Sequence, residues 1–568
     1  MVRAIKGRKT WGIWTLASAA LLFAFSAGAH VSLKNGNFFI PFKDLVYPGG
    51  YEPKIERIYN SKSTYLGMFG WGWGSELESY LSVSVDGSVV MHEYGGGATN
   101  RFVPAKKVSD AEMNKTVEML AETARSVGVP VTSEYKAKLR SDVDYRNREW
   151  TKFLKTGKVK ARTLNENEQL VSTTYSYQYI TKLKGGYVRK YDSGKIEKFN
   201  DEGKLVQVVD NNGNSIALSY NTEGRLAKLV DNFNRKMAFS FNKRGRLENI
   251  AAENSKEVVY KYNDQDELVY SKDDEGNVTT YKYSSDKRHN MTEMVFTEKT
   301  SGKKTLTAIA YYPRDKFENV KTVREGDTIT DYDYVYDKPE KGYSSVTVDI
   351  KNKENQRLSA SKYEYWTKPS SSQFGEPWTY RMVTTLDGEK TDTVYNECCG
   401  LPIQIIRGGE KTSFAYDQKG RVIEKSTPSE TTKLKYDAKA GKVARVDKFS
   451  KGRNKGMHWS EFSYDDKGNL RTAKNSDKKS VKLVYDGQGR IVAMVDQGGR
   501  KLSFKYDPNQ RPAEITDEKL GTIRVSYTNS GEVKSVDTTA GRKIAYQVTS
   551  AFQNLLDIIR PAGVNLSF

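Results

Sequence analysis

The chain has 568 residues, of which 29% are charged and 37% hydrophobic, and its formal net charge at pH 7 is +20. Its 36 tyrosines and an aromatic content of 11% exclude an intrinsically disordered chain, because such chains lack the apolar residues that form a core. Glycine (45 residues) is much more frequent than proline (14 residues), as expected for many tight turns. The composition therefore favours an all-β protein with a polar surface.

Residues 1–29 have the composition of an export signal, with a basic start, the apolar run "WGIWTLASAALLFAFS" and the small residues "AGA". The basic residues are Arg3, Lys6, Arg8 and Lys9. We expect cleavage between Ala29 and His30, so that the mature protein is secreted, on the cell surface or in the periplasm of a bacterial envelope. An uncleaved anchor is the alternative, since residues 11–29 are almost long enough to span a bilayer.

A segment without β periodicity interrupts the N-terminal part of the chain. Ser109 and Glu112 form a capping-box pattern, which predicts the start of a helix. Apolar residues at helical spacing predict a second helix from Ser133 to Lys155. We therefore expect a helical hairpin insertion over residues 104–174 that packs on the sheet. A lid or a docking element for a partner is the alternative.

An aromatic residue recurs every 21 residues from 199 to 283, and again from 464 to 527. An aspartate follows many of them after 11 residues, as at Asp210, Asp231 and Asp496. Together with related positions between the two stretches, the repeat aromatics are Phe199, Tyr220, Phe241, Tyr262, Tyr283, Tyr395, Tyr416, Tyr436, Tyr464, Tyr485, Tyr506 and Tyr527.

Each repeat contains two short strand-like segments and two turns. Segments such as "KLVQVV" and "SIALSY" alternate or are apolar, which is typical of strands, and "DNNGN" and "NTEGR" are typical of tight turns. Two strands per repeat predict an antiparallel sheet over residues 175–546 rather than a parallel β-helix. We expect the repeat aromatics to pack against neighbouring copies. A row of sugar-binding rings is the alternative.

The two cysteines, Cys398 and Cys399, are adjacent in "YNECCGLP". In an oxidising compartment they could form a vicinal disulfide, although adjacent Cα atoms at ~3.8 Å are closer than ordinary disulfide geometry prefers. Two reduced thiols, a metal link and an intermolecular link remain open alternatives.

The sequence carries no recognisable catalytic or metal-binding motif. It has no GxSxG elbow, no P-loop and no dinucleotide fingerprint, and its four histidines are far apart: His30, His92, His289 and His458. We therefore expect no enzyme activity, no cofactor and no metal. The enzymatic alternative is a polysaccharide-active enzyme with two convergent carboxylates, which a sequence alone does not reveal.

Several repeats carry similar motifs: "YNTEGRLAKLVD", "YDQKGRVIEKST", "YDGQGRIVAMVDQGGRKLSFKYD" and "YDDKGNLRTAKN". They resemble the YD repeat of the RHS (rearrangement hotspot) family, which includes the tyrosine-aspartate shells of bacterial toxins and teneurins. The resemblance covers roughly residues 186–546. It implies a long antiparallel sheet of 21-residue repeats that spirals into a hollow shell.

Residues 30–103 also resemble this family. "RIYNSKSTYLGMFGWGWGSELESYL" and "DGSVVMHEYGGGATNRF" are similar to the β segment that opens many RHS proteins. We expect Trp71 and Trp73 of this segment to form a core plug or a sheet cap. Contact with a ligand is the alternative.

Toxin-bearing relatives end their shell with an Asp-Pro-Gly-Leu type self-cleavage motif, followed by a toxin domain. Residues 547–568 of this chain instead have the pattern of a short apolar helix and tail. This difference argues against self-cleavage and against a covalently attached toxin.

Loss of the four basic residues of the signal lowers the net charge from +20 to +16. Such a surface attracts polyanions. For an exported protein we expect acidic polysaccharide, lipopolysaccharide or an envelope protein as the partner, and no specific nucleic acid. The sequence thus predicts an exported binding, adhesive or scaffolding β-shell. The alternative is a toxin-delivery carrier shell without its own toxin domain, which encloses a separately encoded cargo.

Overall fold

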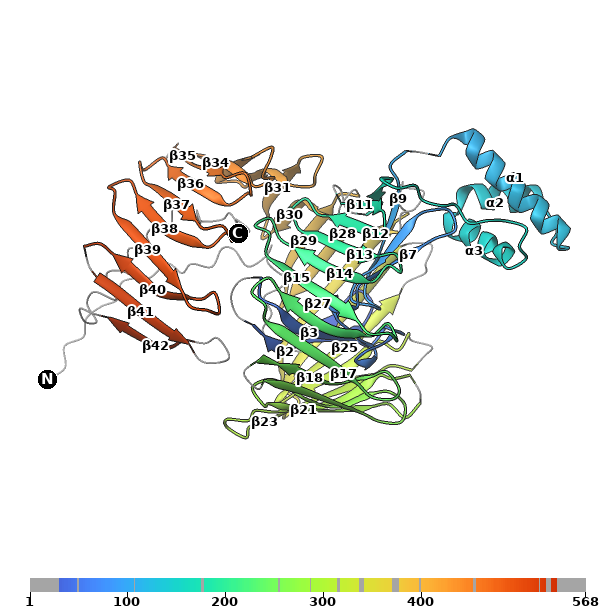
Figure 1. The fold of residues 1–568 in the computed structure, drawn as a ribbon, viewed down its shortest axis with the longest axis horizontal. Helices are drawn as coiled ribbons and strands as arrows, with labels where there is room; N and C mark the ends of the chain where they lie inside the picture. Colours follow the sequence, from blue (N-terminus) through green and yellow to red (C-terminus); the bar gives the residue numbers. More distant parts are fainter. Residues whose placement is uncertain are drawn as a thin grey trace.

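Most of the protein is one antiparallel sheet of 36 strands, β7 to β42 (Figure 1). In this sheet, strands that follow each other in the chain are paired with each other. The structure, a computed structural model, describes residues 30–538 except 48–50, 107, 175–177, 254–255, 287, 314–316, 337–341, 370–376, 398–399, 453–455, 520 and 528–532. The predicted all-β fold with a small helical insertion is confirmed.

The N-terminal strands form a separate four-stranded sheet in the order β1-β2-β3-β6 and a small β4-β5 hairpin, followed by a 3₁₀ turn, Glu76–Glu78. Their bounds are β1 (His30–Ser32), β2 (Asn37–Val46), β3 (Lys54–Asn60), β4 (Leu66–Gly67), β5 (Gly70–Trp71) and β6 (Trp73–Gly74).

The large sheet begins with β7 (Tyr80–Val83), β8 (Val89–His92), β9 (Thr99–Pro104) and β10 (Gln169–Ser172). Regular hairpins follow: β11 (Tyr179–Leu183), β12 (Gly186–Lys190), β13 (Ile196–Asn200), β14 (Leu205–Val209), β15 (Ser215–Tyr220), β16 (Leu226–Asp231), β17 (Lys236–Phe241), β18 (Leu247–Ala252), β19 (Glu257–Tyr262), β20 (Leu268–Lys272), β21 (Val278–Tyr283), β22 (Met291–Thr297), β23 (Lys304–Tyr311) and β24 (Val320–Glu325).

Longer strands form the middle of the sheet: β25 (Thr328–Tyr336), β26 (Tyr343–Asn352), β27 (Arg357–Lys368), β28 (Trp378–Leu386), β29 (Glu389–Tyr395), β30 (Pro402–Arg407), β31 (Glu410–Tyr416), β32 (Val422–Ser426) and β33 (Glu430–Tyr436). The last strands are β34 (Val443–Ser450), β35 (Met457–Tyr464), β36 (Leu470–Asn475), β37 (Ser480–Tyr485), β38 (Ile491–Asp496), β39 (Lys501–Tyr506), β40 (Pro512–Asp517), β41 (Gly521–Tyr527) and β42 (Val533–Thr538).

The insertion contains three helices rather than the predicted hairpin of two. The first, α1 (Asp110–Ser126), starts with the predicted capping box. The predicted second helix is divided into α2 (Ser133–Ser141) and α3 (Val143–Leu154). Asp142 leaves the helical conformation there, and its side chain caps α3 by accepting from the backbone amide of Tyr145 (2.8 Å). The sheet resumes at β10, within the range predicted for the insertion.

The three helices form a small core of their own and project from the sheet (Figure 1). Its fully or largely buried residues are Val117, Leu120, Ala124, Leu139, Trp150, Phe153 and Val159. The indole Nε1 of Trp150 also donates to the carbonyl of Lys160 (3.0 Å), which fixes the chain that returns to the sheet.

Most repeat turns are built by an Asp or Asn that follows the repeat aromatic, although Ser284 stands there after Tyr283. Oδ1 of Asp486 accepts from the backbone amides of Gln488 and Arg490 (3.0 and 2.9 Å), and Oδ2 accepts from Nε of Arg490 (2.6 Å). Gly489 completes the turn at a φ of 81°, a conformation that glycine adopts without a steric penalty. The same pair of amide contacts is made by Asn221, Asn242, Asp417 and Asp465.

The repeat tyrosine ties each hairpin to the one before it. The hydroxyl group of Tyr220 donates to the carbonyl of Leu205 (2.6 Å), and that of Tyr485 donates to the carbonyl of Leu470 (2.9 Å). Equivalent bonds are made by Tyr262, Tyr283, Tyr416, Tyr436, Tyr464, Tyr506 and Tyr527. The strand register shifts at these tyrosines, and such bulges increase the twist of a sheet.

The N-terminal sheet lies within the curve of the large sheet and shares its main hydrophobic core (Figure 1). Tyr59 of β3 is completely buried. Its hydroxyl group donates to the carbonyl of His289 (2.9 Å) and accepts from the backbone amide of Met291 (2.8 Å). The N-terminal sheet is therefore hydrogen-bonded to the shell as well as packed against it.

The large sheet coils, so that turns far apart in the sequence meet. The side-chain amides of Asn212 and Asn469 exchange two hydrogen bonds (3.2 and 2.9 Å). Asn214 donates to the carbonyl of Gln488 (3.0 Å), one hairpin further along. These contacts join the β14–β15 turn to turns of the β35–β38 region, as the predicted spiral requires.

Candidate functional site

The inner face of the sheet is the face that contacts the N-terminal sheet. In β23 and β24 this face carries the buried residues Ile309 and Val323, which are paired. Val323 is paired in turn with Thr330 of β25, and directly paired residues share a face. Alternate residues of β25, including Tyr332 and Tyr334, therefore continue the inner face beyond the N-terminal sheet.

The inner face of β12–β24 is covered by the N-terminal sheet, and we call this region the filled end. Its centre holds a buried ion pair between Arg57 (0% exposed) and Asp44 (2% exposed). Nε of Arg57 donates to Oδ2 of Asp44 (2.6 Å), and Nη2 donates to Ser271 and Tyr281 of the shell (both 2.9 Å). Tyr260 of the shell donates to Asp44 (2.7 Å). The ion pair thus fastens the N-terminal sheet to strands β19–β21.

Aromatic rings surround this ion pair. The guanidinium carbon of Arg57 lies 4.5 Å from the ring centre of Phe42 and 4.4 Å from that of Trp73. Burial opposes the charge of Arg57, but the Asp44 carboxylate, together with Tyr281 and Tyr260, outweighs it, so the pKa of Arg57 lies well above its ordinary value. Arg57 is therefore charged at any physiological pH.

A second buried carboxyl group lies where the N-terminal segment meets the shell. Oε1 of Glu78 accepts from the backbone amide of Met68 (2.6 Å). Arg246 of the shell donates to the carbonyl of the adjacent Gly67. Burial raises the pKa of Glu78 to about 7, against the opposing effects of the Met68 amide and of Arg246. This carboxyl group therefore titrates near neutral pH.

Beyond the filled end the inner face lacks a continuous core. Between Val323 and Val443, the buried hydrophobic residues of the described chain are Val346, Val348 and Val383. The main hydrophobic core ends in β24, and the second begins in β34. Aromatic residues of the intervening strands are only partly buried, as at Tyr363, Tyr365, Tyr395, Phe414 and Tyr416. We call the inner face of β25–β31 the inner wall.

The inner wall is rich in hydroxyl groups and poor in charge. Its strand pairings place on one face Thr330, Tyr332, Tyr334, Tyr336, Ser344, Ser359, Ser361, Tyr363, Tyr365, Thr384, Thr391, Thr393, Tyr395, Thr412 and Tyr416. Its charged residues, Glu389, Arg407 and Glu410, lie at hairpin ends, where Arg407 pairs with Glu389 (2.9 Å). Burial raises the pKa of Tyr332 and of Tyr416 to about 12, so these hydroxyl groups are neutral at physiological pH.

The outer face of the same strands carries ion pairs instead. They are Asp331 with Lys351 (2.7 Å), Lys362 with Glu364 (3.1 Å), Arg381 with Asp392 (2.6 Å) and Asp349 with Arg357 (3.0 Å). The two faces therefore differ in chemistry: charged groups face solvent, and neutral hydroxyl groups and rings face inward.

The structure separates the two predicted plug tryptophans. Trp73 is buried (1% exposed), and its indole Nε1 donates to the hydroxyl group of Tyr283 (3.0 Å). Trp71 is partly exposed and stacks on the imidazole of His289, with ring centres 4.6 Å apart. Nδ1 of His289 lies 2.9 Å from Glu267, which is buried (4% exposed), so Trp71 covers a His–carboxylate pair.

The remaining predicted site residues are the repeat aromatics, the two cysteines and the residues of the expected cleavage site. The repeat aromatics lie on the inner face, where Phe199 is buried and Phe241 packs against the core without a hydroxyl bond. Tyr395 contacts the sulfur of Met382 (4.0 Å) in place of a carbonyl. Cys398, Cys399, Ala29 and residues 547–568 lie outside the described residues, and His30 begins β1.

Within the described residues, no cluster of His, Cys, Asp and Glu is arranged to hold a metal ion. None of the described helices has the length and hydropathy to cross a membrane. The Arg57–Asp44 pair was missed from the sequence. A signal was present, since Arg57 stands between Ile55 and Tyr59 in an alternating strand whose other inward residues are apolar.

The sequence profile of a family described as Teneurin YD-shell matches residues 180–568, more than half of the chain. The chain belongs to the teneurin YD-shell family. A second profile, described as a domain of unknown function (DUF6531), matches residues 28–102 of this YD-shell protein.

The YD-shell protein is similar to a curated protein, double-stranded DNA deaminase toxin A of Burkholderia cenocepacia (strain H111). The two are 30% identical over 122 residues, which are 20% of this chain and 8% of that protein. The chain thus spans less than a tenth of this relative.

This chain also matches solved structures of Tc toxin components. A TcdB2-TccC3 structure without the hypervariable C-terminal region is 11% identical, with a TM-score of 0.40, and the match covers 90% of this chain and 30% of that chain. A Photorhabdus luminescens Tc holotoxin pore is 10% identical, with a TM-score of 0.39, and the match covers 89% of this chain and 29% of that chain.

Proposed function

We propose that this YD-shell protein is a carrier shell whose inner wall surrounds a polypeptide cargo, with a toxin as the class of cargo. The observation that carries the proposal is the contrast within the inner face. One end is filled by the N-terminal sheet. Beyond Tyr332, which packs against the main core, the inner wall bears partly exposed rings and hydroxyl groups that belong to neither of the two large described cores.

The chemistry of the inner wall suits a polypeptide. Tyrosine offers an apolar ring and one hydroxyl group, so it packs against side chains and hydrogen-bonds to backbone groups without selecting a particular sequence. Few fixed charges are present to form ion pairs that would hold a cargo tightly. A wall of this kind would contact many sequences weakly and release them.

Two further findings support the carrier. The chain belongs to the YD-shell family, and the curated relative that it matches is named as a toxin. They favour the carrier over the adhesive surface shell predicted as the main function from the sequence. Export and the nature of the partner remain predictions.

A photo-crosslinking amino acid tests the proposal when it replaces Tyr363 on the inner wall. The matched control replaces the neighbouring residue, Lys362, which is exposed on the outer face. Both variants are produced as the full chain in the host together with the genes next to its own. We expect the inner position to crosslink to one discrete polypeptide that protease added to the intact protein does not degrade.

We expect the outer position to give only protease-sensitive products. Equal crosslinking from both positions, or none from the inner one, would overturn the carrier. Crosslinks from position 362 alone would instead support the adhesive shell. A thermal unfolding curve close to that of the parent protein shows that each variant is folded.

A further inference from the structure

A pocket of about 710 Å³ lies at one edge of the shell, where the N-terminal sheet meets β24–β27. This volume falls in the range of small-molecule sites. Its lining comes from two sides of the contact: Lys34, Asn35 and Lys62 from the N-terminal sheet, and Phe317, Asn319, Tyr336, Gly342, Tyr343, Ser344 and Thr367 from the shell. Two of the pocket residues, Tyr336 and Ser344, also belong to the end of the inner wall.

Phe317 presents an exposed aromatic ring to this pocket. Its side chain is 66% exposed, and its ring lies 5.5 Å from that of Tyr336 in an edge-to-face contact. Phe317 and Glu318 both have positive φ values, 61° and 53°, which are unfavourable for residues other than glycine. The chain thus holds a large apolar ring in solvent at a conformational cost, a combination typical of binding positions.

The polar groups of the pocket are positive or neutral. Lys62 donates to the carbonyl of Phe317 and to Oδ1 of Asn319 (3.0 Å), and Nδ2 of Asn319 donates to the hydroxyl group of Tyr336 (2.6 Å). Among the described residues, neither Lys34 nor Lys62 lies within ion-pair distance of a carboxylate.

The carboxylates of Glu318 and Glu364, which adjoin or contact residues of the pocket, have partners of their own. Glu318 accepts from Arg288 (3.3 Å), and Glu364 accepts from Tyr343 (2.8 Å) and from Lys362 (3.1 Å). Burial lowers the pKa of Lys62, against the opposing effect of Glu318. The pocket therefore combines two lysines without a direct carboxylate partner among the described residues, amide and hydroxyl groups, and an open ring.

We propose that this pocket binds an acidic saccharide. The exposed ring of Phe317 would pack against the apolar face of a sugar, the amide and hydroxyl groups would bond to sugar hydroxyls, and Lys34 and Lys62 would bind its carboxylate. This inference does not depend on the carrier proposal, because the pocket shares only Tyr336 and Ser344 with the hydroxyl-bearing residues of the inner wall.

Calorimetric titration of the full chain tests the pocket with three probes: trigalacturonate, neutral maltotriose and inorganic phosphate. We expect saturable binding of trigalacturonate and little binding of the other two. Phe317→Ala and Lys62→Gln should each weaken trigalacturonate binding about tenfold, or ~1.4 kcal/mol, because the first removes the ring that packs on the sugar and the second a cation that binds its carboxylate.

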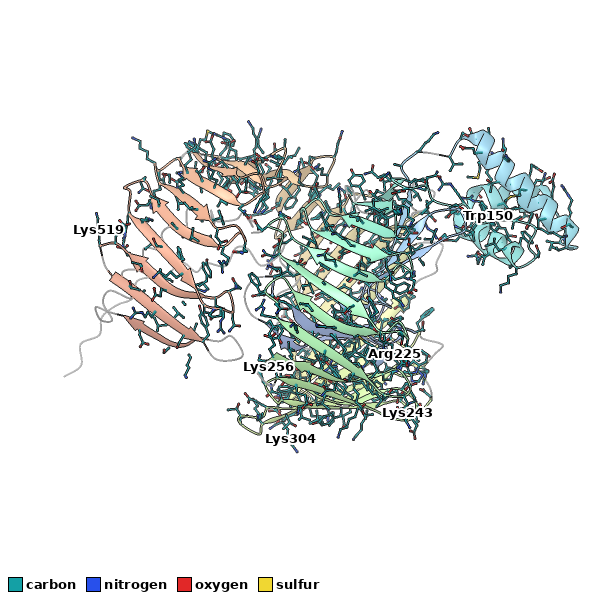
Figure 2. All side chains as sticks on the ribbon, in the orientation of Figure 1. Trp150, Arg225, Lys243, Lys256, Lys304 and Lys519 are labelled. Atoms are coloured by element: carbon teal, nitrogen blue, oxygen red, sulfur yellow. The ribbon has the colours of Figure 1, made fainter. Side chains whose placement is uncertain are left out.

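The matched control is Lys304→Gln, which removes the same charge from an exposed lysine outside the pocket (Figure 2). It should leave trigalacturonate binding unchanged. An equal loss in the control would mean that net charge alone attracts the saccharide and would overturn the site. Equal binding of maltotriose would overturn the role of the lysines, equal binding of phosphate would overturn the saccharide, and no binding would overturn the proposal.

Discussion

The filled end and the inner wall are made of the same antiparallel hairpins, but their inner faces differ. In the filled end, buried residues of the shell pack against Phe38, Tyr59 and Trp73 of the N-terminal sheet. In the inner wall, the inward-facing rings of Tyr363, Tyr365 and Phe414 are only partly buried, and no second sheet packs on them. The comparison shows that strand pairing, with a tyrosine–carbonyl bond at Tyr416, holds the sheet together where its inner side has no continuous core. Because no second sheet packs on the inner wall, its side chains are available to contact another molecule.

The largest difference between the two regions should come from their ion pairs. Arg57→Ala leaves Asp44 buried without its cation, and breaking a buried pair in this way costs about 3–5 kcal/mol. Arg381→Ala, the control, breaks a pair with Asp392 on the outer face near the inner wall, where exposed pairs contribute about 1 kcal/mol or less. Denaturant titration of the full chain measures both. A similar loss of unfolding free energy in both variants would show that Arg57 does not fasten the N-terminal sheet to the shell.

Removal of one phenylalanine from each region tests packing directly. Phe239 of the filled end is 7% exposed, whereas Phe414 of the inner wall is only partly buried. Phe239→Ala should destabilise the protein by about 3–5 kcal/mol, because it leaves a cavity in a packed core. Phe414→Ala should cost about 1 kcal/mol, because the ring is only partly buried and its removal leaves no enclosed cavity. Shifts of the unfolding midpoint measure the difference. A large loss at Phe414 would mean that the inner wall is packed after all.

The dependence of the protein's stability on pH should include a contribution from the titration of Glu78 in the filled end. Its folded pKa, about 7, lies above the ordinary value of 4.5, so the folded state holds this proton longer than the unfolded state. The contribution of Glu78 to the free energy of unfolding is therefore constant below about pH 4.5. It decreases as the pH rises to about 7 and is constant again above that pH. The total decrease is of the order of 3 kcal/mol. Glu78→Gln should remove this decrease. Unfolding curves of both proteins between pH 4.5 and 8 provide the measurement, and an unchanged slope in the variant would assign the effect to another group.

The smallest effect should come from the hydroxyl group of a single repeat tyrosine. Tyr485→Phe keeps the ring but removes the bond to the carbonyl of Leu470, at a cost of about 1 kcal/mol. Tyr485→Ala should cost several times more, because it also removes the ring. Lys482→Ala, in an exposed position of the same strand, should stay within about 0.5 kcal/mol. Chemical denaturation distinguishes the three, and equal effects would place the tyrosine outside the core.

Much of the fold could be predicted from the sequence because the repeat makes its own turns. A tyrosine, an Asp or Asn and a glycine at fixed spacing specify the bulge, the turn and the next strand, as Tyr485, Asp486 and Gly489 do. The division of the second insertion helix was not predicted, since Asp142 is compatible with a helix interior and becomes a cap only through its backbone conformation.

The candidate site was harder to predict. Tyr260 of the filled end and Tyr363 of the inner wall have the same chemistry and similar surroundings in the sequence. Their burial differs because the N-terminal sheet reaches one and not the other, and that depends on contacts between residues some 200 positions apart, such as Arg57 with Ser271 and Tyr281. The pocket at Phe317 likewise requires Lys34 and Tyr336 to be brought together by the fold.

The pairing of each strand with its neighbours in the chain determines how the shell responds to the gain or loss of a repeat. Each hairpin is bonded to the hairpins that precede and follow it in the chain, and its tyrosine reaches back only to the preceding one. Duplication or deletion of one repeat therefore inserts or removes two strands, about 10 Å of sheet width, and keeps the pairing between all other neighbouring strands. The circumference of the shell can grow or shrink by single genetic events, so an ancestral shell could be resized for a different content without redesign of its wall.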